Sequence, residues 1–468
     1  MEKLRGQRTI AGLPARIAGA YLVLFITATG IYAFSWPHAP YLNIADSPWY
    51  MEAARDLSDG SVDNLNNRSP GFPLFLILTG ATQHPTRAFW FVSLILHFAG
   101  IWLLAQVLHT ARLSEGAIIL FGVLLLLPPQ VENAAILMTE NLTQFCLILT
   151  LTSLIWWFRQ RKSIWLVVSA LTIAYGGLVR PTYQLFAFVL AGCLFVIRLL
   201  NLSSFKITEM VKASFILVAA TVLIIGGYSS LNYYKFGYFG LTPLLGFNLS
   251  SKTVRVIEKL PDQYADVREM LVSARDKQLI SPGSEHAGLQ YIWSVGTEGI
   301  QEKTKLSKAE ASKYMLRLNL LLIRKAPLEY LSAVADSMAM YWFPSSKDPA
   351  NMNSRVLQSV WVLVHFVMVG LFALQLLVLG GITIFYGSTR IFATERRAII
   401  DLTLYKIPLI AYFLSGITVF YTMLITCMVD IGDPRQRSGD ALLVFMSFIG
   451  FHIWWRSVRG DPDNLLAG

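Results

Sequence analysis

Acidic side chains stand at two places in this sequence where hydroxyl chemistry is feasible. Asp46 opens a short polar segment, and Glu140 lies within the apolar run Leu137-Met138-Thr139-Glu140-Asn141-Leu142. A carboxylate can act as a general base that takes a proton from a hydroxyl group. Ionisable groups inside or beside membrane helices are costly to retain, so each one is a hypothesis about function.

Basic side chains stand at comparable positions. Arg68 precedes the turn Ser69-Pro70-Gly71-Phe72-Pro73, and Arg180 ends an apolar run in Arg180-Pro181-Thr182. Guanidinium and ammonium groups suit phosphate recognition. Acids and cations together suit an anionic, lipid-linked substrate, in which one carboxylate activates the acceptor and cations hold the departing phosphate. The further candidates for phosphate or substrate binding are Tyr50, Asn232, Lys252, Arg255, Arg435 and Arg437.

The acids also have plainer interpretations. Asp46 before Ser47-Pro48 is typical of a helix start, so a helix cap and a catalytic base are equally good explanations of it. On such a helix Asp46, Tyr50 and Ala54 share one face. Glu140 has no Lys or Arg near it in the sequence, so it must find a partner elsewhere or stay protonated.

The cations have plainer interpretations as well. Arg68 can anchor at lipid headgroups, and Arg435 and Arg437 can belong to an ordinary charged loop between two apolar segments. Arg180 can pair with Glu140, grip a phosphate, or do both.

The elements that must position these side chains are membrane helices. The 468 residues are 54% hydrophobic and 15% charged, against a usual charged share of about 25%. Helices are the expected form, because a chain in lipid must satisfy its own backbone hydrogen bonds. We predict an all-α polytopic membrane protein with about ten (9–12) spanning helices. They are placed at 16–35, 86–109, 114–128, 133–157, 163–179, 183–199, 211–230, 357–386, 402–427 and 440–456.

Loop charges orient these helices. The N-terminus and four later short loops are basic, which places both termini in the cytoplasm and the candidate residues on the external face. The net charge of +10 belongs largely to these loops, so it does not indicate nucleic-acid binding. The three cysteines lie in apolar segments and form neither a disulfide framework nor a metal motif.

The chain divides into three parts. Residues 1–230 form an N-terminal membrane module, whose first external loop, 36–70, carries Asp46. Residues 231–327 form a long external loop with predicted helices over 264–277 and 307–323. Residues 328–468 form the C-terminal membrane helices, and the short apolar stretch 328–343 suits the membrane interface.

The order of these landmarks resembles the GT-C glycosyltransferases, in particular the branch with protein O-mannosyltransferases and the lipid A aminoarabinose transferase. The landmarks are Asp46-x-x-x-Tyr50, the Arg68-to-Pro73 turn, Thr139-Glu140, Arg180-Pro181-Thr182, Asn232 and a late arginine loop. Asp46 has no adjacent acid, and the late loop, Pro434-Arg435-Gln436-Arg437-Ser438, differs from the arginine–tyrosine–arginine type of relatives.

This resemblance implies an inverting sugar transfer from a polyprenyl-phosphate donor to a lipid, glycan or protein acceptor at the external face of a bacterial inner membrane. It implies that Asp46 is the base. Glu140 would orient the acceptor or, with Asp46, help to bind a divalent metal such as Mg or Mn. Arg180, Arg435 and Arg437 would hold the donor phosphate.

Two other classes remain open. A secondary transporter would also have polar groups in membrane helices, although this chain shows no repeated halves. An O-antigen ligase or polymerase would use a diphosphate-linked oligosaccharide together with arginines and a histidine in a large external loop, where His286 lies. The chemical form of the donor distinguishes a ligase or polymerase from a glycosyltransferase of the GT-C type.

Overall fold

The computed structural model describes residues 9–10, 12–35, 46–61, 68–127, 130–131, 134, 136–279, 292, 297–343, 359–360, 362–377, 406–430, 432 and 440–459. The prediction of an all-α protein is confirmed for these residues. The one exception is a pair of two-residue antiparallel strands, β1 (Thr9–Ile10) and β2 (Leu13–Pro14).

Among the described residues, five helices are long and apolar enough to cross a membrane: α4 (Arg87–Thr110), α7 (Glu140–Gln160), Pro181–Leu199, α10 (Ile207–Phe236) and α18 (Lys406–Val429). Pro181–Leu199 comprises η4 (Pro181–Tyr183) and α9 (Phe186–Leu199). Shorter apolar helices are α1 (Ala15–Ser35), α5 (Glu115–Leu125), α8 (Ser163–Val179) and Val362–Leu377, and α19 (Asp440–Arg459) comes last. Every predicted span therefore contains a helix, while the count of ten crossings stays a prediction.

One predicted boundary is wrong. The fourth span was placed at 133–157, but α7 begins at Glu140, and residues 136–139 form bends. The Leu137 carbonyl accepts a hydrogen bond from Ser47 Oγ (2.9 Å) and is not part of a helix. Glu140 thus lies in the first turn of α7, where the helix macrodipole favours a negative charge.

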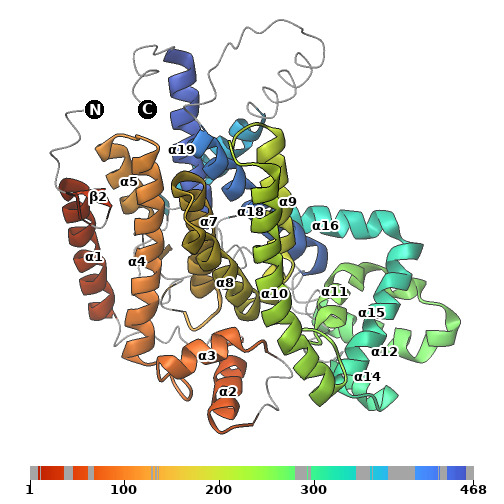
Figure 1. Ribbon diagram of the computed structural model, residues 1–468. Helices are drawn as coiled ribbons and strands as arrows, with labels where there is room; N and C mark the ends of the chain where they lie inside the picture. The colour runs from red at the N-terminus through yellow and green to blue at the C-terminus, as the bar shows by residue number, and fades with distance from the viewer. Residues whose placement is uncertain are drawn as a thin grey trace, which may run out of the picture.

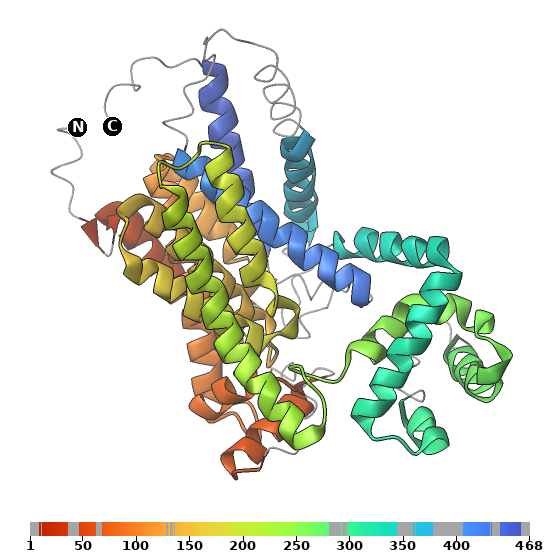
Figure 2. The same cartoon turned by 45° about the vertical axis from the view of Figure 1, so that its right-hand side comes forward.

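The long helices pack side by side in a bundle (Figures 1 and 2). Helix α7 contacts α4, α8 and α18, and α8 also contacts α10. In its most apolar window α7 is 83% buried, whereas α10 is 28% buried, so α7 is central and α10 peripheral. Two short helices, α2 (Ser47–Ser58) and α3 (Gly71–Leu78), lie at the end of the bundle where α4 and α7 begin and α8 ends.

The described residues between 245 and 325 form a separate cluster of helices beside the bundle, here called the loop unit (Figure 1). It has its own apolar core, which includes Phe247, Ile257, Leu271 and Leu318. The predicted helices at 264–277 and 307–323 are confirmed as α12 and α15. The elements are α11 (Leu245–Thr253), η5 (Val254–Lys259), η6 (Asp262–Tyr264), α12 (Ala265–Leu279), α14 (Thr297–Thr304) and α15 (Lys308–Lys325).

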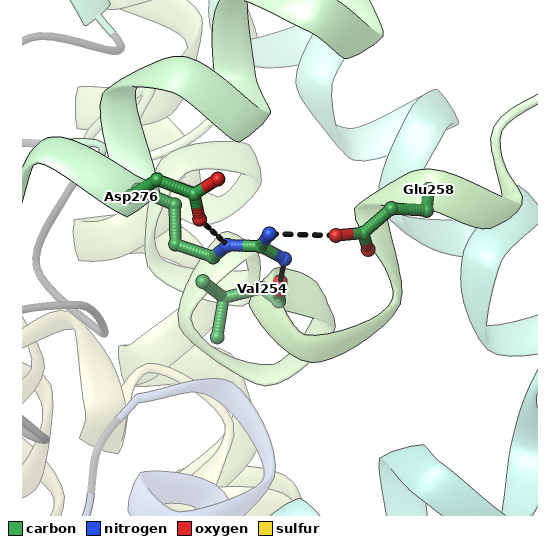
Figure 3. A network of polar contacts seen from close by, with 4 residues as sticks. Val254, Glu258 and Asp276 are labelled. Carbon is green, nitrogen blue, oxygen red and sulfur yellow. Dashed lines mark hydrogen bonds and ion pairs between the residues drawn. The ribbon is translucent and has the colours of Figure 1, made fainter. Parts of the chain in front are cut away.

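A polar network ties α12 to η5 within the loop unit (Figure 3). The Arg275 guanidinium donates to Glu258 Oε1 (2.6 Å), Asp276 Oδ1 (2.9 Å) and the Val254 carbonyl (3.1 Å). The bond from Arg275 lowers the pKa of the Glu258 carboxyl group. A guanidinium with several donors in a fixed fork can hold three acceptors at once.

Helices α11 and α15 meet at very close range. A Cβ atom on Gly246 would lie 1.8 Å from the Ser312 carbonyl oxygen, so only glycine permits this contact. Buried Asn319 donates to the Gly246 carbonyl (2.7 Å) and accepts from Thr253 Oγ1 (2.6 Å). This fixes the face of α11 that carries Lys252. Helix α16 (Pro327–Tyr341) then leads back to the bundle.

Candidate functional site

Helix α2 is held firmly against the bundle end. Ser47 is fully buried and bonds to the carbonyl of Leu137, three residues before Glu140. Met51 and Ala54 pack with Phe72 of α3 in an apolar cluster that also includes residues of α7 and α8. The predicted helix over this segment is confirmed, and its start is brought next to the start of α7.

Asp46 stands at the N-cap position of α2, but its side chain makes no capping hydrogen bond. Its Oδ1 atom instead accepts a bond from Arg68 Nη2 at 2.7 Å. The Asp46 side chain is 49% exposed, against 16% for Arg68. Arg68 also stacks over the Tyr50 ring, 5.2 Å from its centroid. The interpretation of Asp46 as a helix cap is therefore disfavoured, and its carboxylate stays accessible.

The turn after Arg68 contains Pro70 and Gly71, and the structure gives each of them a role. Pro70 caps α3, and Gly71 lies so close to α8 that a Cβ atom would be 2.5 Å from the Val179 nitrogen. The Tyr175 hydroxyl of α8 donates to the Gly71 carbonyl at 2.9 Å. The turn thus locks the Arg68 segment onto the end of α8, directly before Arg180.

The pairing of Glu140 with Arg180 is confirmed, with 3.3 Å between Oε1 and Nη1. Both side chains are largely buried, 11% and 14% exposed. Glu140 Oε2 is buried and has no hydrogen-bond partner among the described residues. The next residue, Asn141, donates to the Ser93 carbonyl of α4 at 2.8 Å and so steadies this turn.

Tyr50 lies at the centre of these four charges. Burial raises the pKa of its hydroxyl, and Arg68, Asp46, Glu140 and Arg180 all act on it electrostatically. Its ring also meets Phe72 edge to face at 5.1 Å. Five residues predicted from four separate sequence segments therefore form one cluster, here called the paired-charge cluster (Asp46, Tyr50, Arg68, Glu140 and Arg180).

The turn that carries Arg180 is also tied to α18. Helical backbone angles are disfavoured for a residue that precedes a proline. Arg180 precedes Pro181, and its backbone is extended (φ −140°, ψ 112°). The Tyr421 hydroxyl of α18 donates to the Thr182 carbonyl at 2.7 Å. Asp430, just past the end of α18, acts electrostatically on both Arg180 and Lys252. Asp430 was not predicted. The available signal was a charged residue at the end of a span, which is the signal that indicated Arg180.

Lys252 is 3% exposed, and its ammonium donates to Ser337 Oγ of α16. Burial is the main cause that lowers the pKa of Lys252 to about 8, and the field of Asp430 opposes it. A buried ammonium group whose pKa lies close to neutral pH can bind an incoming anion. Lys252 joins the paired-charge cluster through Asp430.

Lys308 is a second lysine near the cluster, and it was not predicted from the sequence. It begins α15, and its pKa is lowered by burial and by the nearby Arg68. A lysine in the first turn of a helix opposes the macrodipole, and that was the available signal. Lys308 adds a cation from the loop unit beside the Arg68 guanidinium.

Four of the other predicted residues lie elsewhere or outside the described residues. Asn232 donates to the carbonyls of Gly240 (2.6 Å) and Leu241 (3.4 Å), so its amide holds the turn after α10. Arg435 and Arg437 lie outside the described residues. Arg255 is exposed and pairs with Asp336 at 2.6 Å, on the surface near Lys252. None of these positions tests a role in substrate binding, which stays a prediction.

In the part of the chain that the structure describes, no group of three or more His, Cys, Asp or Glu side chains could hold a metal ion. Asp46 and Glu140 are each paired with an arginine. No protein-family model matches this sequence, and no curated protein is detectably similar to it.

Proposed function

We propose that this protein is a membrane glycosyltransferase that moves a sugar from a polyprenyl-monophosphate donor to a hydroxyl acceptor. The observation that carries the proposal is the paired-charge cluster, where an accessible carboxylate lies beside guanidinium groups at one end of an apolar bundle. The resemblance of its residues to the GT-C glycosyltransferases supports the same conclusion. A donor with an apolar tail and an anionic head would keep its tail in the bilayer and its phosphate at this end.

Asp46 is the proposed base. Arg68 occupies Oδ1, and the other carboxylate oxygen would take the proton of the acceptor hydroxyl. The acceptor oxygen attacks the anomeric carbon while the bond from that carbon to the phosphate oxygen breaks. The electron pair leaves with the polyprenyl phosphate. A single displacement of this kind inverts the anomeric configuration.

Glu140 is proposed to orient the acceptor. Its buried Oε2 atom, without a hydrogen-bond partner among the described residues, can accept a bond from a second acceptor hydroxyl. An unsatisfied buried acceptor costs about 1–3 kcal/mol, so a ligand that satisfies it gains affinity. Arg180 holds the Glu140 carboxylate in place through their ion pair.

The leaving phosphate is proposed to meet cations from two sides. Asp430 acts electrostatically on both Arg180 and Lys252, and Arg68 acts electrostatically on Lys308. Four cations against three carboxylates favour an anionic group at this place. Donors set where charge develops stabilise a transition state more than a ground state.

The topology belongs to the same proposal. The α2 end of the bundle would face the outside of a bacterial inner membrane, with both termini in the cytoplasm and ten crossings in all. The acceptor class, whether lipid, glycan or protein, is open, as is the need for Mg or Mn.

The test is sugar transfer by purified protein in lipid nanodiscs. Radiolabelled polyprenyl-monophosphate sugars and diphosphate-linked oligosaccharides are offered with lipid, glycan and peptide acceptors, each with and without EDTA. We expect label to move from a monophosphate donor and inversion at the anomeric carbon. Transfer from diphosphate-linked oligosaccharides alone would contradict the proposal and indicate a ligase or polymerase. Flux without transfer in proteoliposomes would indicate a transporter.

A further inference from the structure

Helix α16 carries an apolar stripe that no described part of the protein covers. Leu328 is 76% exposed, Leu331 58% and Phe343, just beyond the helix, 56%. Ala335 and Ala339, also exposed, continue the line between them. Their spacing of three or four residues places the first four along the chain on one face of the helix, and Phe343 follows them just past its end.

The other two faces of α16 are occupied. Ala333, Val334, Ser337 and Tyr341 are buried toward the protein. On a polar edge, Glu329 pairs with Lys259 (2.5 Å) and Asp336 with Arg255 (2.6 Å). The stripe is thus set apart from a face that packs on protein and from an edge that pairs with η5.

The stripe continues into a surface of the bundle that is suited to lipid. Phe343 meets Phe366 of helix Val362–Leu377 edge to face at 6.4 Å, and His365 Nε2 donates to the Trp342 carbonyl at 2.9 Å. That apolar helix exposes Leu363 (67%) and Leu377 (75%). In both views α16 lies across the direction of the bundle helices (Figures 1 and 2).

Charge complements this surface. Helix α15 ends with Arg324 and Lys325, both exposed, immediately before α16 begins. Cations beside an apolar stripe are typical of a helix that lies in the headgroup region, because they attract lipid phosphates while the stripe enters the acyl chains.

We propose that α16 is an interfacial helix whose apolar stripe (Leu328, Leu331, Ala335, Ala339 and Phe343) lies in one leaflet of the bilayer. Arg324 and Lys325 meet the lipid headgroups. The opposite face of α16 holds Lys252 through Ser337. The depth of α16 in the bilayer therefore sets the level of the Lys252 ammonium relative to the lipid phosphates. This inference stands on the stripe itself and survives if the proposed reaction is wrong.

The test uses the full-length protein in nanodiscs of phosphatidylcholine and phosphatidylglycerol. An environment-sensitive NBD label is attached at Leu331→Cys or, as the matched control, at the exposed Glu329→Cys on the polar edge. The three native cysteines are buried and are replaced by alanine. Emission and quenching are measured with doxyl-labelled lipids and with aqueous iodide.

We expect the label at 331 to emit at shorter wavelength and to be quenched several-fold more strongly by doxyl lipid than the label at 329. Iodide should show the reverse order. Equal, water-like behaviour at both positions would overturn the proposal. Shielding of 331 from both quenchers, with energy transfer between labelled copies, would also overturn it and would indicate a protein contact.

Discussion

The charges of the paired-charge cluster and those of the loop unit differ in burial and in arrangement. In the cluster, the Glu140–Arg180 pair is largely buried, and four charges surround one tyrosine. In the loop unit, Lys259–Glu329 and Arg255–Asp336 join it to α16 through pairs whose members are each about half exposed. Exposed pairs contribute about 0–1 kcal/mol, whereas breaking a buried pair costs about 3–5 kcal/mol.

This difference indicates which of the many charged residues are candidates for a functional role. The pairs around the loop unit satisfy one another and hold helices together. The cluster leaves a buried oxygen of Glu140 without a hydrogen-bond partner among the described residues, and half of the Asp46 side chain accessible. Groups that are ordered but incompletely satisfied are the ones available to a ligand.

The largest predicted effect comes from breaking the buried pair. Glu140→Ala should lower stability by about 3–5 kcal/mol, because Arg180 would keep a buried charge without its partner. Glu329→Ala, which removes an exposed partner, is the matched control and should cost about 0–1 kcal/mol. Thermal unfolding of both variants in detergent measures the difference. Equal shifts in unfolding temperature would contradict the expected difference between the buried pair and the exposed pair.

The next effect concerns the close contact of α3 with α8. Gly71→Ala should cost about 1–3 kcal/mol, because the new methyl group meets the backbone of Val179 and forces a shift. The shift should also displace Arg68 and lower the transfer rate. Gly192→Ala is the control, since a Cβ atom there meets nothing within 4 Å. A fully active, stable Gly71→Ala would show that the turn does not position Arg68.

A pH dependence should distinguish Lys252 from the exposed cations. Its folded pKa of about 8 lies below the unfolded value of 10.5, so the buried ammonium costs stability at pH below about 8. That cost fades as pH rises from about 8 toward 10.5, and wild type should gain stability relative to Lys252→Met over this window. Unfolding temperatures measured between pH 7 and pH 9.5 would reveal the trend.

Donor binding should show the opposite dependence. If the Lys252 ammonium holds the donor phosphate, donor affinity should fall as pH rises through about 8. Lys252→Arg, which keeps its charge, should extend binding to higher pH. An unchanged profile in Lys252→Arg would remove Lys252 from the donor site.

The smallest predicted effect belongs to the surface of the loop unit. Lys259→Ala should lower stability by about 0–1 kcal/mol, and high salt should remove that difference because salt screens exposed pairs. Unfolding temperatures at low and high salt measure it. A loss that is large and independent of salt would mean that this pair behaves like the buried one.

Much of the cluster could be predicted because chain topology brings span ends together. Glu140 and Arg180 both lie at ends of spans on one side, and their pairing follows from the alternation of the helices. Disfavouring the helix cap for Asp46 needed the structure, since its side chain contacts Arg68, 22 residues away, while its role as a base stays a prediction. Lys308 and Ser337 reach the site through the packing of the loop unit and α16 against the bundle, and the packing of one helix on another leaves no periodic signal in the sequence.

The most direct test of the central claim is the initial rate of sugar transfer by Asp46→Asn in nanodiscs. Asp59→Asn is the matched control, because Asp59 is an exposed acid at the other end of α2. We predict a loss of about 10²–10⁴-fold for Asp46→Asn, with unchanged donor binding and unfolding temperature, and a wild-type rate for Asp59→Asn. Full transfer by Asp46→Asn would contradict the assignment of the base.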